Sequence, residues 1–210
     1  MTEAWIIDAV RSPRGKGKET GALHNVHPQR ILAQVLNALQ ARNGFDTADV
    51  DDIIWGTSAQ MGQQGGDMGR MAALDAGYDQ RASGVTLDRF CGSGITATNL
   101  AAGQIMSGME DLVIAGGCEM MSYVTVFGGK VREAGLGSSG GMSNGNARLQ
   151  AAHPQSHQGV CADAIAAKEG ISRTALDAFG AESQRRAALA IQEGRFDKSV
   201  VAVVADDGSV

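Results

Sequence analysis

The sequence predicts an α/β fold built on a mainly parallel sheet that is covered by helices on both faces. Two observations support this prediction: short apolar runs alternate with stretches of helical periodicity, and the connections between them are short. The length also fits, because 210 residues can bury a sizeable apolar core. Hydrophobic residues make up 43% of the chain and charged residues 20%, which is ordinary for a soluble globular protein.

Five short apolar runs are the expected strands. They cover residues 5–9, 53–55, 85–87, 112–115 and 200–204. The first run ends at Arg11-Ser12-Pro13 and the second at Gly56, and both endings are turn signals. Asp207-Gly208 predicts a hairpin turn after the last run, with only two residues beyond it, so we expect the polypeptide to stop in mid-fold.

Four expected helices lie between or after these runs. They begin after Pro28, near Met68, at Gly92 and after the N-cap residue Ser172, and they end near residues 39, 76, 108 and 193. The helix from Gly92 to about Gly108 is uncharged and rich in small residues. That composition predicts a helix buried on all sides rather than one with a solvent-facing stripe.

The pattern changes after Met121, and we divide the chain there into a core domain, 1–121, and a second domain, 122–210. Residues 127–146 are rich in Gly and Ser and lack apolar periodicity. They are expected to form a long excursion from the core.

Charge and cysteine usage exclude several classes of function. A net charge of -5 offers no general basic surface for nucleic acid or an anionic membrane. The N-terminus does not have the pattern of a secretory signal, and no run is apolar enough to span a bilayer, so we expect a cytoplasmic protein. Neither the three cysteines nor the four histidines show metal-ligand spacing, and no metal is expected.

Cys91 is the candidate nucleophile, in the stretch DRFCGSG at 88–94. It follows an expected strand at the start of a helix, where the helix dipole and free amides favour a thiolate over a thiol. A buried, unreactive cysteine is an equally good interpretation from position alone. We assign Cys118 and Cys161 to packing.

Four stretches together resemble the thiolase family of acetyl-CoA acetyltransferases and 3-ketoacyl-CoA thiolases. They are RSPRGKGKETGAL at 11–23, DRFCGSG at 88–94, AGGCEMMS at 115–122 and HQGVCADAIAAKEGISR at 157–173. The resemblance implies a thiolase-like layered fold, of which 1–121 is the N-terminal core half and 122–210 is part of the substrate-covering loop domain.

The resemblance also implies a chemistry for Cys91. Its thiolate would attack an acyl-CoA thioester, and the acyl-enzyme would pass the acyl group to CoA or to a second acetyl-CoA. His157 matches a position that lines the pantetheine pocket. Gln158 stands where methionine is common, and Asp88 stands where asparagine is common. Coenzyme A is expected as a substrate, with no further cofactor, and the subunits are expected to form a homodimer or homotetramer.

The remaining catalytic groups of the family do not occur in these 210 residues: a Gly-His-Pro histidine, a Cys-x-Gly cysteine and an Asn-Glu-Ala segment. We therefore expect a fragment or one piece of a split enzyme that needs a C-terminal thiolase half and is inactive alone. One alternative is a non-catalytic remnant that binds acyl-CoA or pairs with other subunits. Another is a decarboxylating condensing enzyme on a related fold, which AGGCEMMS disfavours.

Overall fold

The structure is a computed structural model that describes residues 3–126 and 145–209. The chain divides into two compact units. The first holds the described residues 3–126 and 199–209, and the second holds 145–198. These compact units are not the same division as the predicted domains, because the last residues belong to the first unit. The functional division after residue 121 stays a prediction.

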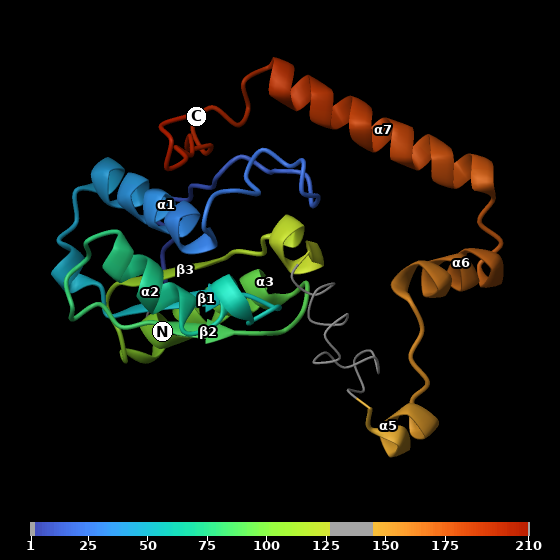
Figure 1. The fold of residues 1–210 in the computed structure, drawn as a ribbon, viewed down its shortest axis with the longest axis horizontal. Helices are drawn as coiled ribbons and strands as arrows, with labels where there is room; N and C mark the ends of the chain where they lie inside the picture. The colour runs from blue at the N-terminus through green and yellow to red at the C-terminus, as the bar shows by residue number, and fades with distance from the viewer. Residues whose placement is uncertain (1–2, 127–144, 210) are drawn as a thin grey trace. The chain divides into compact units, whose positions relative to one another are not determined.

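A parallel sheet of three strands forms the centre of the first unit (Figure 1). The strands are β1 (Asp52–Gly56), β2 (Val85–Leu87) and β3 (Val113–Gly117), in the order β2-β1-β3. In this register Ile54 of β1 lies beside Val85 on one side and Ala115 on the other. The sheet confirms the predicted fold class, and the three runs predicted between residues 53 and 115 are its strands.

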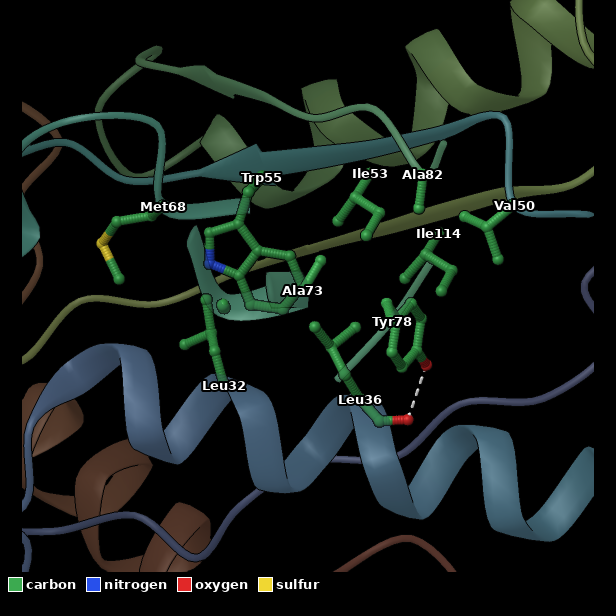
Figure 2. Packing of buried hydrophobic residues seen from close by; sticks show 11 residues of the cluster. Leu32, Leu36, Val50, Ile53, Trp55, Met68, Ala73, Tyr78, Ala82 and Ile114 are labelled. Atoms are coloured by element: carbon green, nitrogen blue, oxygen red, sulfur yellow. Dashed lines mark hydrogen bonds between the residues drawn. The ribbon is translucent and has the colours of Figure 1, made fainter. Parts of the chain in front are cut away.

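Two helices, α1 (Pro28–Asn43) and α2 (Met68–Asp75), pack on one face of the sheet. Alternate residues of β1 point towards them, because successive side chains of a strand point to opposite faces. Figure 2 shows Trp55 and Ile53 of β1 directed towards Leu32 and Leu36 of α1. The buried cluster consists of Leu32, Leu36, Val50, Ile53, Trp55, Met68, Ala72, Ala73, Tyr78, Ala82 and Ile114.

The helix α3 (Ser93–Ser107) packs on the other face of the sheet. Ala97 and Ala101 of this helix pack on Ile54 of β1. The opposite side of α3 is open in this chain, with Ile95 72% exposed and Leu100 50% exposed. The predicted burial of this helix on all sides is therefore wrong for the chain as it stands, although the uncharged composition that led to it is real.

Two of the predicted strands do not form in the structure. Residues 3–10 run outside any strand, and Trp5 and Ile6 are 76% and 82% exposed. Val200 makes only an isolated parallel bridge with Arg11, and residues 201–205 are irregular. An apolar run predicts an extended backbone, but a strand also needs a neighbour to pair with, and neither run has a regular ladder here.

The second unit consists of α5 (Ala147–Ala152), α6 (Gln158–Lys168) and α7 (Arg173–Gln192). The predicted N-cap of the long helix is confirmed, since Ser172 Oγ accepts a hydrogen bond from the Ala175 N–H at 3.2 Å. None of these three helices contains a buried residue. The predicted excursion at 127–146 lies almost wholly outside the described residues. Across the described part of the chain, no helix has both the length and the apolar character to cross a bilayer.

Tyr78 offers a test of the core between α1 and the sheet. Its hydroxyl donates a hydrogen bond to the Leu36 carbonyl at 2.8 Å, and burial raises the pKa of Tyr78 to about 12. Tyr78→Phe should cost about 1 kcal/mol of unfolding free energy at neutral pH, because a buried carbonyl loses its donor. The native tyrosine keeps its proton to higher pH than the unfolded one, so wild-type stability must fall between about pH 10 and 12.

Urea unfolding of both proteins at pH 7 and pH 11 measures this effect. The Tyr78→Phe variant should lose less stability between the two pH values than the wild type. Equal losses in both proteins would contradict the assignment of alkaline sensitivity to this buried hydroxyl.

Candidate functional site at the carboxyl end of the sheet

Cys91 lies in the turn that joins the end of β2 to the start of α3. The turn covers residues 88–92, and the Cys91 side chain is exposed. No side chain caps the first turn of α3, whose N-cap residue is Gly92. The first N–H groups of a helix have no partner within the helix. The thiol thus stands on an exposed turn beside backbone donors, and the interpretation of Cys91 as a buried packing residue does not fit its exposure.

The residue before the thiol has an unusual backbone conformation. Phe90 has φ of 50°, and it is the only residue other than glycine with positive φ in the described part of the chain. This region is unfavourable for a side chain with a Cβ atom. Asp88 Oδ1 offsets part of this cost by accepting a hydrogen bond from the Phe90 N–H at 2.7 Å. The local shape that presents Cys91 therefore depends on a side chain three residues earlier.

Ser93 fixes the same turn from its other end. Its Oγ accepts from the Arg89 N–H at 2.8 Å and donates to the Phe90 carbonyl at 2.7 Å. The residue is buried against the end of β1, where Gly56 has no side chain. A Cβ atom added to Gly56 would lie 2.8 Å from two carbon atoms of Ser93, which is shorter than the contacts that Cβ atoms make in proteins. The glycine thus permits the start of α3 to pack directly on the strand.

A network of neutral donors surrounds Glu119, which follows β3. Its carboxylate accepts from the Ser58 N–H at 2.8 Å and from Gln64 Nε2 at 2.9 Å. Gln64 is fully buried, and its Oε1 accepts from the Met120 N–H at 2.6 Å. These bonds tie the loop after β1 to the end of β3, beside the turn at 88–92. Ser58 also connects this network to the turn at 88–92, since its Oγ donates a hydrogen bond to Asp88 at 2.7 Å.

The other two cysteines lie in different surroundings. Cys118 packs against the core beside β1, where its N–H donates to the Gly56 carbonyl. Burial, with a smaller effect from the negative charge of Glu119, raises the pKa of Cys118 to about 12. The packing role predicted for Cys118 fits this position. Cys161 is exposed on α6, in the second unit. The described residues do not bury it, so the packing role predicted for it does not fit its position.

The residues predicted to bind substrate, His157 and Gln158, lie together at the start of α6. His157 is the N-cap, and its Nδ1 accepts a hydrogen bond from the Gly159 N–H at 3.1 Å. This bond requires an unprotonated Nδ1 and leaves Nε2 to carry the ring proton. Gln158 is the first residue of the helix, and both side chains are exposed. Their role in substrate binding stays a prediction.

Sequence reasoning missed three residues of the candidate site. Ser58 and Gln64 lie in a polar loop without a recognisable motif, and their roles depend on partners that are distant in the chain. Phe90 carried no signal for positive φ, because glycine, asparagine and aspartate are the residues usually found there.

Comparison with known proteins decides the family. The family model described as "Thiolase, N-terminal domain" matches residues 4–209. The chain belongs to the thiolase family. A 3-ketoacyl-CoA thiolase from Psychrobacter cryohalolentis is 39% identical over 202 residues, which cover 96% of this chain and 49% of the relative. One from Acinetobacter baumannii is 38% identical over 204 residues, covering 97% and 49%.

A solved structure shows the same fold. The Bacillus anthracis acetyl-CoA acetyltransferase superposes with a TM-score of 0.76 at 29% identity, covering 98% of this chain and 52% of that one. The family resemblance predicted from the four stretches is confirmed. The chain spans about half the length of the curated thiolases that it matches. In this thiolase chain, DRFCGSG forms the turn between β2 and α3, and AGGCEMMS covers the end of β3.

The contrast between the cysteines gives a direct test. At pH 8 in the folded 210-residue chain, iodoacetamide should modify Cys91 and Cys161 while Cys118 reacts at least about 100-fold more slowly. Only the thiolate is nucleophilic, and a pKa of about 12 leaves roughly one Cys118 in 10,000 ionised at that pH.

Peptide mapping by mass spectrometry measures the three rates. Labelling in urea is the control, where all three thiols should react at similar rates. Labelling of native Cys118 as fast as Cys161 would show that its burial does not suppress the thiolate.

Proposed function

We propose that this chain supplies the nucleophile of a thiolase-type acyltransferase. The observation that carries the proposal is the exposed Cys91 on a fixed turn at the start of α3, in a chain that belongs to the thiolase family. The substrate class proposed is the acyl-CoA thioester, which fits the relatives named 3-ketoacyl-CoA thiolase and acetyl-CoA acetyltransferase. Coenzyme A enters as a substrate rather than as a bound cofactor.

The chemistry begins with the Cys91 thiolate. Its sulfur attacks the 3-keto carbonyl carbon, C3, of a 3-ketoacyl-CoA, and the bond between C3 and C2 breaks after the tetrahedral intermediate forms. Acetyl-CoA leaves once its carbanion takes a proton, and the shortened acyl group stays on the sulfur as a new thioester. The thiolate of free CoA then attacks that thioester and releases Cys91 and a shorter acyl-CoA. A thiol suits both steps because it is a good nucleophile and a good leaving group.

In thiolysis the electron pair of the broken C2–C3 bond goes to C2 of the departing acetyl-CoA. In the reverse direction Cys91 takes an acetyl group from acetyl-CoA, and a second acetyl-CoA forms the new carbon–carbon bond. Backbone N–H groups at the uncapped start of α3 are suited to stabilise the oxyanion of either tetrahedral intermediate.

Further groups are required for the proton transfers, and we propose that a C-terminal thiolase half supplies them. The chain spans about half of the curated relatives. The open face of α3 also supports this proposal, because Ile95, Leu100 and Met106 are 72%, 50% and 49% exposed on a helix without a charged residue. An apolar face of this kind is suited to contact another part of a protein. We propose that His157 and Gln158 contact the CoA part of the substrate.

The test combines the chain with a matching C-terminal half. Alone, the 210-residue chain should show no thiolysis of acetoacetyl-CoA, and addition of the second half should restore it. Cys91→Ser should then lower the rate by about a thousandfold or more, because a hydroxyl is scarcely ionised at neutral pH and members of a catalytic unit do not replace one another.

Cys161→Ser is the matched control, since it removes an exposed thiol elsewhere and should leave turnover unchanged. Intact-mass analysis should find an acetyl group on Cys91 after acetyl-CoA is added. Turnover by Cys91→Ser would refute the proposed nucleophile, and turnover by the isolated chain would refute the need for a second half. Binding of acyl-CoA by the combined halves without turnover would favour the non-catalytic alternative.

We also propose that the complete protein is a homo-oligomer with a subunit contact near β2. This strand lies at an edge of the described sheet, and Val85 is 42% exposed. An uncovered sheet edge offers unpaired backbone groups to a second subunit. Light scattering of the combined halves at micromolar concentration should give at least a dimer of the assembled protein, and a monomeric mass would contradict this proposal.

A further inference from the structure

Ser58 occupies an unusual place between the ends of all three strands. It follows β1 by two residues, and its backbone and side chain are held by carboxylates that follow the two neighbouring strands. Its N–H donates to Glu119 at 2.8 Å, and its Oγ donates to Asp88 at 2.7 Å. We propose that Ser58 and Asp88 are positioning residues for Cys91. The proposal rests on the proposed function in taking Cys91 as the nucleophile.

Asp88 connects Ser58 to the nucleophile turn. Its Oδ1 accepts one hydrogen bond from the Ser58 hydroxyl and one from the Phe90 N–H, each at 2.7 Å. Hydrogen bonds to an ionised acceptor are short and strong. The bond to Phe90 is an Asx turn, which holds that residue at φ of 50° immediately before Cys91. The orientation of the carboxylate therefore determines how well the strained turn is maintained.

The Ser58 hydroxyl fixes this orientation. Asp88 is exposed, so water competes for its oxygens, and an aspartate held by one bond is free to rotate away from the Phe90 N–H. The hydroxyl, in contrast, is itself held in place, because Glu119 binds the Ser58 N–H and the buried Gln64. A rigid donor in the loop after β1 thus restrains the carboxylate that follows β2.

The chain offers variants that separate positioning from general stability. Ser58→Ala removes only the hydroxyl, since the N–H bond to Glu119 is retained, and Ser58→Thr restores a hydroxyl. Asp88→Asn keeps an oxygen that can accept both bonds, whereas Asp88→Ala removes it. Ser107→Ala is the matched control, because Ser107 Oγ donates to the Gln104 carbonyl at 2.9 Å at the far end of α3.

The measurement is the native-state rate of alkylation of Cys91 by iodoacetamide in the 210-residue chain, divided by the rate at Cys161 in the same molecule. Ser58→Ala and Asp88→Ala should lower this ratio by about threefold to tenfold, the scale of one lost hydrogen bond of ordinary net strength. In Ser58→Thr and Asp88→Asn, which keep the hydroxyl or the oxygen, the ratio should be at least half of the wild-type value. Ser107→Ala should leave the ratio unchanged.

Two results would overturn the proposal. One is an unchanged or increased ratio in Ser58→Ala with native circular dichroism. The other is a similar fall in Ser107→Ala. If Ser58→Ala does not fold, the pair Asp88→Asn and Asp88→Ala decides, and equal ratios in that pair refute the role of the carboxylate oxygen. Alkylation requires no acyl transfer, so this test can fail while the thiolase proposal stands, and it can succeed in a chain that shows no turnover.

Discussion

The close contact between β1 and the start of α3 is the constraint on which the candidate site depends. Gly56 ends β1 without a side chain, and the backbone and Cβ of Ser93 fill the space where one would lie. Only this approach brings the Ser93 hydroxyl under the turn, where it bonds to both Arg89 and Phe90. The next strand has the same requirement, since a Cβ atom on Gly117 would lie 2.7 Å from the Gly56 carbonyl oxygen. Gly56 thus sets the depth at which the helix and the turn pack on the sheet, and its pairing partner Gly117 leaves room for the end of β1.

The polar network at the carboxyl end of the sheet follows from this packing. Because the three parallel strands end at the same edge of the sheet, the residues that follow them lie close together. Two of these residues, Asp88 and Glu119, carry carboxylates. Neutral groups donate to both: a serine hydroxyl, backbone N–H groups and the amide of Gln64. A buried Gln64 would destabilise the fold if its amide were unpaired, so its bonds to Glu119 and Met120 make the loop after β1 specific in shape.

The prediction from sequence succeeded where a pattern reports local backbone geometry together with burial. The runs at 53–55, 85–87 and 112–115 became strands because each is flanked by helices that cover the sheet, and the Ser172 cap marked its helix correctly. The runs at 5–9 and 200–204 are also short and mainly apolar. A strand forms only where a neighbouring strand pairs with it, and composition does not predict that neighbour. The position of Cys91 followed from a motif. The support of its turn by Ser58 and Gln64 did not, because those contacts join residues about 30 to 60 positions apart.

Cys91 and Cys118 show why position after a strand does not suffice to identify a nucleophile. Cys91 follows β2 and Cys118 follows β3, the two strands that flank β1 in the same parallel sheet. Cys118 directly follows β3 and packs, partly buried, against the core, and burial raises the pKa of its thiol to about 12. The chain at Cys91 instead reverses through the positive φ of Phe90, which exposes the sulfur beside the first N–H groups of α3. The turn, rather than the residue type or the strand, therefore distinguishes the exposed thiol from the partly buried one, and this is why we propose that the residues that hold the turn position Cys91.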